Sequence, residues 1–204
     1  MITLPISATD RAVGMMRRGG TVVFPTETSY GLGCDATNTG AVEKIFAIKE
    51  RAASKSVLIV VDSISRARQY IKWNSAIDMI AAHYWPGAVT VVGEYKKPFW
   101  KKLSPFTVAA NGTVAVRVTT HPLLVKMVKA LGRPIVATSA NPSGAGDVYS
   151  AASALATFVA RDPSPDMILD GGDLIVRPPT TIVSVVGNEI KILRQGEVVI
   201  NCSH

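Results

Sequence analysis

Cations, hydroxyls and side-chain amides make up most of the residues in this sequence that could do chemistry. Lys49 and Arg51 form a K-E-R motif, and Ser139 and Asn141 stand in T-S-A-N-P-S-G much further along the chain. Further candidates of the same kinds are Lys55, Arg117, Thr180 and Arg194. Such a set suits a polyanionic substrate, because phosphoryl and nucleotidyl transfer depend on positioning and charge neutralisation more than on a protein nucleophile.

Several other chemistries find little support in the sequence. No Walker lysine motif occurs, and the G-L-G at 31–33 lacks the rest of a dinucleotide-binding fingerprint. Paired catalytic carboxylates are not apparent, and we interpret Glu27 and Asp35 as residues that structure loops. No histidine stands in a metal-binding pattern or beside an obvious nucleophile, so we predict neither a protein metal site nor a hydrolytic triad.

The stretch V-V-F-P-T-E-T-S-Y-G-L-G-C-D-A at 22–36 predicts the local structure that would position several of these groups. Its apolar start is typical of a short strand that Pro25 ends, and a hydroxyl-rich loop with two flexible glycines follows. A helix capped by Asn38 or Thr39 would then end close to Lys49 and Arg51. Spacing alone favours an ordinary surface loop with two cations that complement the helix dipole, and a ligand-binding loop is the alternative.

Composition indicates a globular chain with a basic surface. The 204 residues include 22 lysines and arginines against 15 acidic residues, which gives a net charge of +7. This charge favours anionic partners such as nucleotides, nucleic acid or anionic lipid, although scattered lysines can also serve solubility alone. No apolar run is long enough for a membrane span, no signal peptide is evident, and two cysteines are too few for a disulfide framework. We therefore expect a cytoplasmic protein with no membrane partner.

Strand and helix signals alternate in the first part of the chain, and strands pair as hairpins in the second part. This order predicts a single α/β domain (1–204) with a twisted mixed β-sheet flanked by helices. In T-V-A-V-R-V at 113–118, alternation places three valines on one face and Thr113, Ala115 and Arg117 on the other. The expected helices are 10–18, 39–48, 63–71, 76–84, 121–131 and 149–160. The expected strands are 22–24, 57–61, 88–92, 135–136 and 167–169, with hairpins over 108–118 and 181–193.

The segment 94–106 interrupts this pattern with two prolines, two neighbouring aromatic residues (Phe99 and Trp100) and four lysines: Lys96, Lys97, Lys101 and Lys102. One interpretation is a mobile loop that contacts RNA or covers a site. The other is a solvated loop whose aromatic rings lie on the body of the protein. The sequence supports both equally.

Six motifs occur in the order and spacing of one known family: F-P-T-E-T-S-Y-G-L-G-C-D-A, K-E-R, W-P-G-A-V-T, V-A-V-R-V-T-T-H-P, A-T-S-A-N-P-S-G and I-L-R-Q-G. In these motifs the chain resembles the YrdC/Sua5 family, also called TsaC, over about residues 9–198. The hallmark of the family is K-x-R followed by S-x-N, which Lys49, Arg51, Ser139 and Asn141 match. The resemblance implies a single YrdC-like domain of the short bacterial form.

The resemblance also implies a reaction, the synthesis of threonylcarbamoyl-AMP. L-Threonine and bicarbonate give N-carboxy-threonine, which attacks the α-phosphorus of ATP and displaces pyrophosphate. A separate transferase complex then uses the product to modify adenosine 37 of tRNAs that read ANN codons. Mg²⁺ is the expected cofactor, held mainly by the ATP phosphates, and no organic cofactor is expected.

Residue roles follow from the same resemblance. The implied catalytic residues are Lys49, Arg51, Ser139 and Asn141, with Lys49 bridging the carboxylated amine and the phosphates. The implied ATP-binding residues are Arg51, Lys55, Thr113, Ser139 and Arg194. The implied threonine-binding residues are Thr28, Tyr30, Arg117 and Thr180.

The sequence departs from the family pattern at several positions. Ser29 replaces the usual valine, Ala52 a proline, and Thr180 a serine, while Val60 stands where longer Sua5-type members place a threonine-binding histidine. Two other functions remain open. One is a non-catalytic tRNA- or double-stranded-RNA-binding or ribosome-associated module. The other is a carbamoyltransferase of hydrogenase maturation, which the short chain and its few cysteines disfavour.

Overall fold

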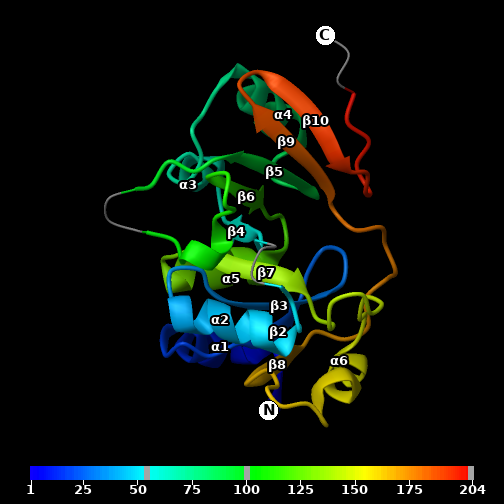
Figure 1. Ribbon diagram of the computed structural model, residues 1–204. Coiled ribbons are helices and arrows are strands. Elements are labelled where there is room, and N and C mark those ends of the chain that lie inside the picture. The colour runs from blue at the N-terminus through cyan, green and yellow to red at the C-terminus, as the bar shows by residue number, and fades with distance from the viewer. Residues whose placement is uncertain (53–55, 99–101, 202–204) are drawn as a thin grey trace.

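The protein is described here from a computed structural model that covers residues 1–52, 56–98 and 102–201. These residues form a mixed sheet with strand order β1-β8-β2-β3-β7-β4-β6-β5-β9-β10, flanked by helices (Figure 1). The strands are β1 (Ile2–Pro5), β2 (Val22–Pro25), β3 (Tyr30–Asp35), β4 (Ile59–Val61), β5 (Val89–Glu94), β6 (Thr113–Val118), β7 (Ile135–Ser139), β8 (Met167–Asp170), β9 (Thr181–Val186) and β10 (Glu189–Arg194). The predicted α/β class and mixed sheet are confirmed.

The helices are α1 (Thr9–Arg17), α2 (Thr39–Ile48), α3 (Ile64–Ala67), α4 (Ser75–Tyr84), α5 (Pro122–Leu131) and α6 (Ala151–Phe158). Two short 3-10 turns, η1 (Ile6–Ala8) and η2 (Pro105–Thr107), complete the described elements. The Asn38 side chain accepts from the Ala41 N–H and caps α2, as predicted. No side chain caps α1, because its N-cap residue is Ala8, and the hydroxyl of Thr9 donates to the Ile6 carbonyl.

Two hydrophobic clusters cover the two faces of the sheet unequally. One cluster contains buried residues of α2, α4 and α6 and extends under β5, β6 and β9. The other contains residues of α1 and α5, which pack on each other over β2, β4, β7 and β8. The second cluster holds no described residue of β5, β6 or β9, so one face of those strands lies beyond the helices that cover the rest.

Alternation along the strands explains this division. Val114, Val116 and Val118 of β6 belong to the first cluster, as the sequence predicted. Successive side chains of a strand point to opposite faces, so Ala115 and Arg117 face the side that α1 and α5 leave open. The sheet thus presents one uncovered face at the β6-β5-β9 edge, and this face positions the site described below.

Four local predictions need correction. Residues 30–35 form strand β3 rather than a flexible loop, and a Cβ at Gly33 would lie 2.0 Å from the Val136 carbonyl oxygen. That glycine therefore permits close strand contact, not a bend. Residues 2–5 form β1, which was not predicted. The helix expected over 63–71 is limited to α3, and the hairpin over 108–118 is reduced to a turn and a single bridge before β6.

The ends of the basic segment 94–106 are tied to the domain. The Lys96 N–H donates to the Tyr70 carbonyl, and the Leu103 N–H donates to the Tyr95 hydroxyl. The ring of Phe106 lies 5.6 Å from that of Phe46. Phe99, Trp100 and Lys101 fall outside the described residues, so the proposed RNA contact stays a prediction. Among the helices that the structure describes, none combines the length and hydropathy needed to cross a membrane.

Candidate functional site

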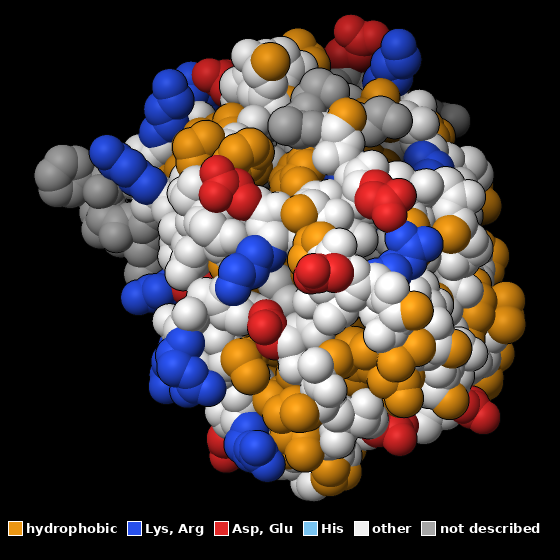
Figure 2. All heavy atoms as spheres, turned by 60° about the horizontal axis from the view of Figure 1, so that its bottom comes forward, with side chains coloured by type: hydrophobic (Ala, Val, Ile, Leu, Met, Phe, Trp, Pro, Cys, Tyr) orange, Lys and Arg blue, Asp and Glu red, His pale blue; other side chains and the backbone are white. Residues whose placement is uncertain are grey.

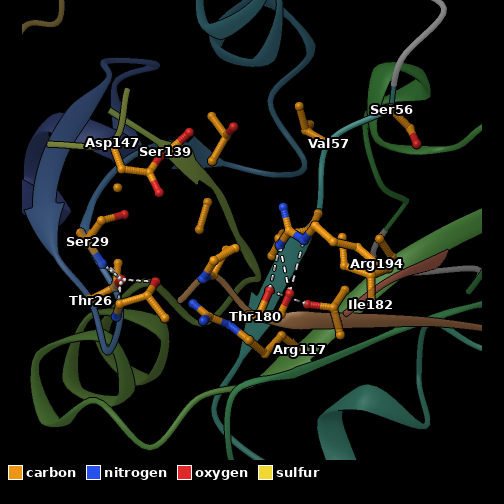
Figure 3. Close-up of a pocket in the computed structure, with 18 of the residues that line it drawn as sticks. Thr26, Ser29, Ser56, Val57, Arg117, Ser139, Asp147, Thr180, Ile182 and Arg194 are labelled. Atoms are coloured by element: carbon orange, nitrogen blue, oxygen red, sulfur yellow. Dashed lines mark hydrogen bonds between the residues drawn. The ribbon is translucent and has the colours of Figure 1, made fainter. Parts of the chain in front are cut away.

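A pocket of about 430 Å³ opens over the uncovered face of the sheet. Its floor comes from the open faces of β5, β6 and β9, and its walls come from the segments that join β2 to β3, α2 to β4, β7 to α6 and β8 to β9. Figure 3 shows Ser29, Ser139 and Asp147 on one side of the pocket and Arg117, Thr180 and Arg194 on the other. The principal polar lining residues are Thr26, Thr28, Ser29, Arg51, Ser56, Thr90, Arg117, Thr138, Ser139, Asp147, Thr180 and Arg194.

Arg117 brings a buried cation to the pocket floor. Its side chain is 4% exposed, and its Nη2 lies 3.4 Å from Oε2 of Glu27. Its Nε has no hydrogen-bond partner although it is buried. A buried guanidinium with an unused N–H beside a cavity is suited to a carboxylate or phosphate ligand, because an unsatisfied buried donor costs free energy.

Glu27 links Arg117 to the neighbouring turn at residues 119–121. Its Oε1 accepts from the Thr119 hydroxyl and from the N–H groups of Thr120 (3.0 Å) and His121 (3.1 Å). Burial alone would raise the pKa of Glu27, but the charge of Arg117 and these hydrogen bonds outweigh it and lower the pKa below its usual value. The prediction that Glu27 structures a loop is confirmed, and it also pairs with a pocket cation.

The loop between β2 and β3 presents hydroxyls to the opposite wall. Thr26 donates to the Ser29 carbonyl (2.7 Å), and its Oγ1 accepts from the Thr28 N–H (3.2 Å). This local network closes a tight turn, and it leaves Thr28 and Ser29 lining the pocket. The hydroxyl-rich loop predicted from the sequence is therefore a wall of the cavity and not only a surface loop.

Arg194 and Thr180 lie together where β10 meets the segment before β9. The Arg194 guanidinium donates to the Thr180 carbonyl (2.8 and 3.1 Å) and to its hydroxyl (3.1 Å), as drawn in Figure 3. Burial lowers the pKa of Arg194, and nearby Asp147 opposes this shift. Below them, the buried hydroxyl of Thr90 lies 3.4 Å from that of Thr180.

Of the predicted site residues, six line one cavity: Thr28, Arg51, Arg117, Ser139, Thr180 and Arg194. Arg51 donates to the Ser56 carbonyl at 2.9 Å, and burial lowers its pKa. Ser139 ends β7, the strand-to-loop junction that the sequence predicted.

Of the other predicted site residues, the four that the structure describes do not line the pocket. Lys49 and Asn141 lie behind its wall and bond to each other. The Tyr30 hydroxyl donates to the Gly172 carbonyl and accepts from the Gly171 N–H, away from the cavity. The Thr113 hydroxyl donates to Oδ1 of Asn111 in the preceding turn. Lys55 falls outside the described residues.

Thr90 and Asp147 are two of the polar lining residues that the sequence argument missed. Thr90 lies on β5 between Val89 and Val91, so strand alternation could have placed its hydroxyl on the open face. Asp147 is the one carboxylate among the described lining residues, and no local pattern marked it. Val60 is fully buried and pairs with Arg117 across β4 and β6, but it is not one of the residues that line the pocket.

Comparison with known proteins places this geometry in a family. The profile of the Sua5/YciO/YrdC family, described as "Telomere recombination", matches residues 14–196. The chain belongs to this family. A protein of Pseudoalteromonas translucida named threonylcarbamoyl-AMP synthase is 35% identical, with 74% of this chain and 80% of that protein covered. A protein of the same name from Thiobacillus denitrificans is 34% identical, with 86% and 89% covered.

Solved structures of the Sua5/YciO/YrdC family share the fold. The crystal structure of P. abyssi Sua5 complexed with L-threonine has a TM-score of 0.85 and 30% identity. It aligns with 96% of this chain, which spans 57% of that longer protein. E. coli YciO, at 23% identity, has a TM-score of 0.78 with 96% and 93% covered, which supports the fold alone.

Proposed function

We propose that this protein is an L-threonylcarbamoyladenylate synthase, a nucleotidyltransferase that forms threonylcarbamoyl-AMP from L-threonine, bicarbonate and ATP. The observation that carries the proposal is the buried Arg117 guanidinium, whose free Nε lies at the floor of a cavity that Arg51 and Arg194 also line. The substrates bring a carboxylate, a carbamate and a triphosphate, so three arginines in one cavity match their charge. The names of the relatives support the same activity.

In the proposed arrangement, threonine lies over β6 and beside the β2-β3 loop. Its carboxylate pairs with Arg117, and the hydroxyls of Thr28 and Thr180 bond to its polar groups. ATP occupies the wall of Ser139 and Arg51, with Arg194 across the cavity and Lys55 as a further predicted contact. Positioned cations stabilise the charge that develops as the carbamate oxygen attacks the α-phosphorus and pyrophosphate leaves.

Mg²⁺ fits this site as an ion held mainly by phosphates. Within the described residues, no three His, Cys, Asp or Glu side chains gather in a way that could hold a metal. Asp147 is the lining carboxylate that could reach such an ion directly or through water. The metal would neutralise phosphate charge, and the arginines would hold the substrate in place.

The test is pyrophosphate release by the purified protein with each substrate omitted in turn. We expect release only when ATP, Mg²⁺, L-threonine and bicarbonate are all present. L-Valine, which has the shape of threonine without its hydroxyl, is the matched control substrate and should support far less release. Equal release without threonine would reject the proposal.

We also propose that the product serves N6-threonylcarbamoyladenosine formation on tRNA in the cytoplasm, through a separate transferase complex. The alternative, a non-catalytic RNA-binding module, predicts a continuous basic surface. On the face shown in Figure 2, the described lysine and arginine side chains lie interspersed with acidic ones. The arginines that line the pocket and the names of the relatives favour the enzyme over this alternative.

A further inference from the structure

The side chain of Lys49 is directed into a turn of the chain and is not among those that line the pocket. Lys49 follows α2 and is 3% exposed. Its Nζ donates to the carbonyl oxygens of Ser139 (2.5 Å) and Asn141 (2.6 Å), and to Asn141 Oδ1 (3.3 Å). An ammonium group has three protons, so these contacts use the whole donor capacity of the side chain.

The same turn is tied to Lys49 by its main chain. The Ser143 N–H donates to the Lys49 carbonyl at 2.9 Å. Asn141 extends the network, because its Nδ2 donates to the Ala145 carbonyl while its Oδ1 accepts from Lys49. Residues 139–145 therefore close around the Lys49 ammonium, and Ser139 at the start of this segment lines the pocket.

All the acceptors of Lys49 are neutral. Within the described part of the chain, no carboxylate forms an ion pair with its ammonium. Burial, and secondarily the nearby charge of Arg51, lower the pKa of Lys49 to about 8, while Asp147 opposes this shift. Burying an ammonium group is costly unless its hydrogen bonds offset the cost, so the bonds from Lys49 to this turn must contribute strongly to its conformation.

We propose that Lys49 is a positioning residue that holds the turn 139–145 against the end of α2 and acts on the substrate only through that turn. The turn continues directly from Ser139, the last residue of β7, and orients the main chain beside the wall assigned to the nucleotide. Removing the ammonium would leave two carbonyl oxygens and one amide oxygen without a donor, so the turn would open more often. Only the identity of the ligand in this inference rests on the proposed function.

Arg51 offers a matched control, because it follows the same helix two residues later and lines the pocket. A residue that contacts phosphate directly should leave the ligand-free turn unchanged when it is replaced. A residue that holds the turn should loosen it even without substrate. Lys49→Met removes the donors and keeps the length and apolar stem of the side chain, and Arg51→Met does the same for the neighbour.

The experiment is amide hydrogen exchange of the ligand-free protein, read at residues 141–145 in the wild type and in both variants. We expect Lys49→Met to speed exchange there by about tenfold or more, with α5 unchanged, because hydrogen bonds to a charged donor each contribute strongly to local stability. Arg51→Met should stay within about twofold of the wild type. Exchange in Lys49→Met no faster than in Arg51→Met would overturn the proposal.

Two further variants cover the case in which Lys49→Met does not fold. Lys49→Gln keeps an N–H donor for the carbonyls, and Asn141→Ala removes only the side-chain part of the network. The proposal is supported if amides 143–145 exchange faster than in the wild type in both variants, and faster in Asn141→Ala than in Lys49→Gln. Exchange at the wild-type rate in both variants overturns it. Since no substrate is present, a failure of threonine-dependent pyrophosphate release would reject the proposed function and leave this result standing.

Discussion

Two cations of this protein are buried to the same extent and are surrounded very differently. Lys49 and Arg117 are each 3% exposed. Arg117 has a carboxylate beside it and a buried Nε without a partner, and it lines the pocket. Lys49 has only neutral acceptors, all its protons are used, and it lies behind the pocket wall.

The difference shows that burial and charge alone do not identify a ligand-binding residue. What distinguishes the two is the unused donor, which Arg117 has and Lys49 lacks. An unsatisfied donor at a cavity gains a partner when ligand binds, whereas a satisfied donor would have to exchange one partner for another. We therefore assign Arg117 to substrate contact and Lys49 to positioning.

The largest effect is expected for Arg117. Arg117→Gln removes the cation and leaves Glu27 as an unpaired buried carboxylate. We expect kcat/KM for threonine to fall roughly 100- to 1000-fold, which corresponds to a loss of about 3–4 kcal/mol of transition-state stabilisation. Steady-state pyrophosphate release at varied threonine measures it. Glu27→Gln/Arg117→Gln is the control for the buried carboxylate, and activity close to wild type in either variant would contradict the assignment.

A smaller effect is expected when Arg117 stays and its partner changes. Glu27→Gln keeps the shape and an acceptor for the 119–121 turn but removes the charge that orients Arg117. The threonine KM should rise about 5- to 30-fold, which corresponds to about 1–2 kcal/mol, while the ATP KM stays constant. An equal change in both KM values would show that Glu27 supports the whole fold and not the Arg117 contact.

The pH dependence of the free energy of unfolding tests the Glu27–Arg117 ion pair independently of activity. The folded pKa of Glu27 is lowered, so its contribution to the free energy of unfolding is present above the unfolded value and is lost as pH falls through the folded one. Glu27→Gln should therefore flatten the acid side of the stability curve relative to the wild type, below about pH 4.5. Denaturant unfolding at several pH values measures it.

The smallest effect concerns Lys49 and the nucleotide. Its pKa of about 8 makes the ammonium form prevail below that pH, and a nucleotide that binds only the closed turn should raise the pKa, because the ammonium group holds the turn closed. Nucleotide affinity should thus weaken by about threefold to fivefold as pH rises from about 7 to about 10, with proton uptake on binding near pH 8. Calorimetry in two buffers of different ionisation enthalpy measures it, and unchanged proton uptake in Lys49→Met would assign the linkage to another group.

The sequence determined much of the fold because its signals are local. The Asn38 cap, the Pro122 start of α5, the continuous apolar run of β4 and the alternation in β6 each act over a few residues. The same motifs, matched in order along the chain, also indicated the family. Six of the predicted site residues then proved to line one cavity.

Only the tertiary structure decided what lies between distant segments. The glycines of β3 suggested a flexible loop. Gly33 is needed instead because Val136, on a strand about a hundred residues later, lies too close to allow a side chain there. Likewise, K-x-R followed by S-x-N suggested four residues around one ligand. Two of them, Arg51 and Ser139, line the pocket, whereas Lys49 and Asn141 are bonded to each other and do not. Side-chain type sets what a residue can bind, and the direction in which the fold points it sets whether a ligand or the protein itself uses that capacity.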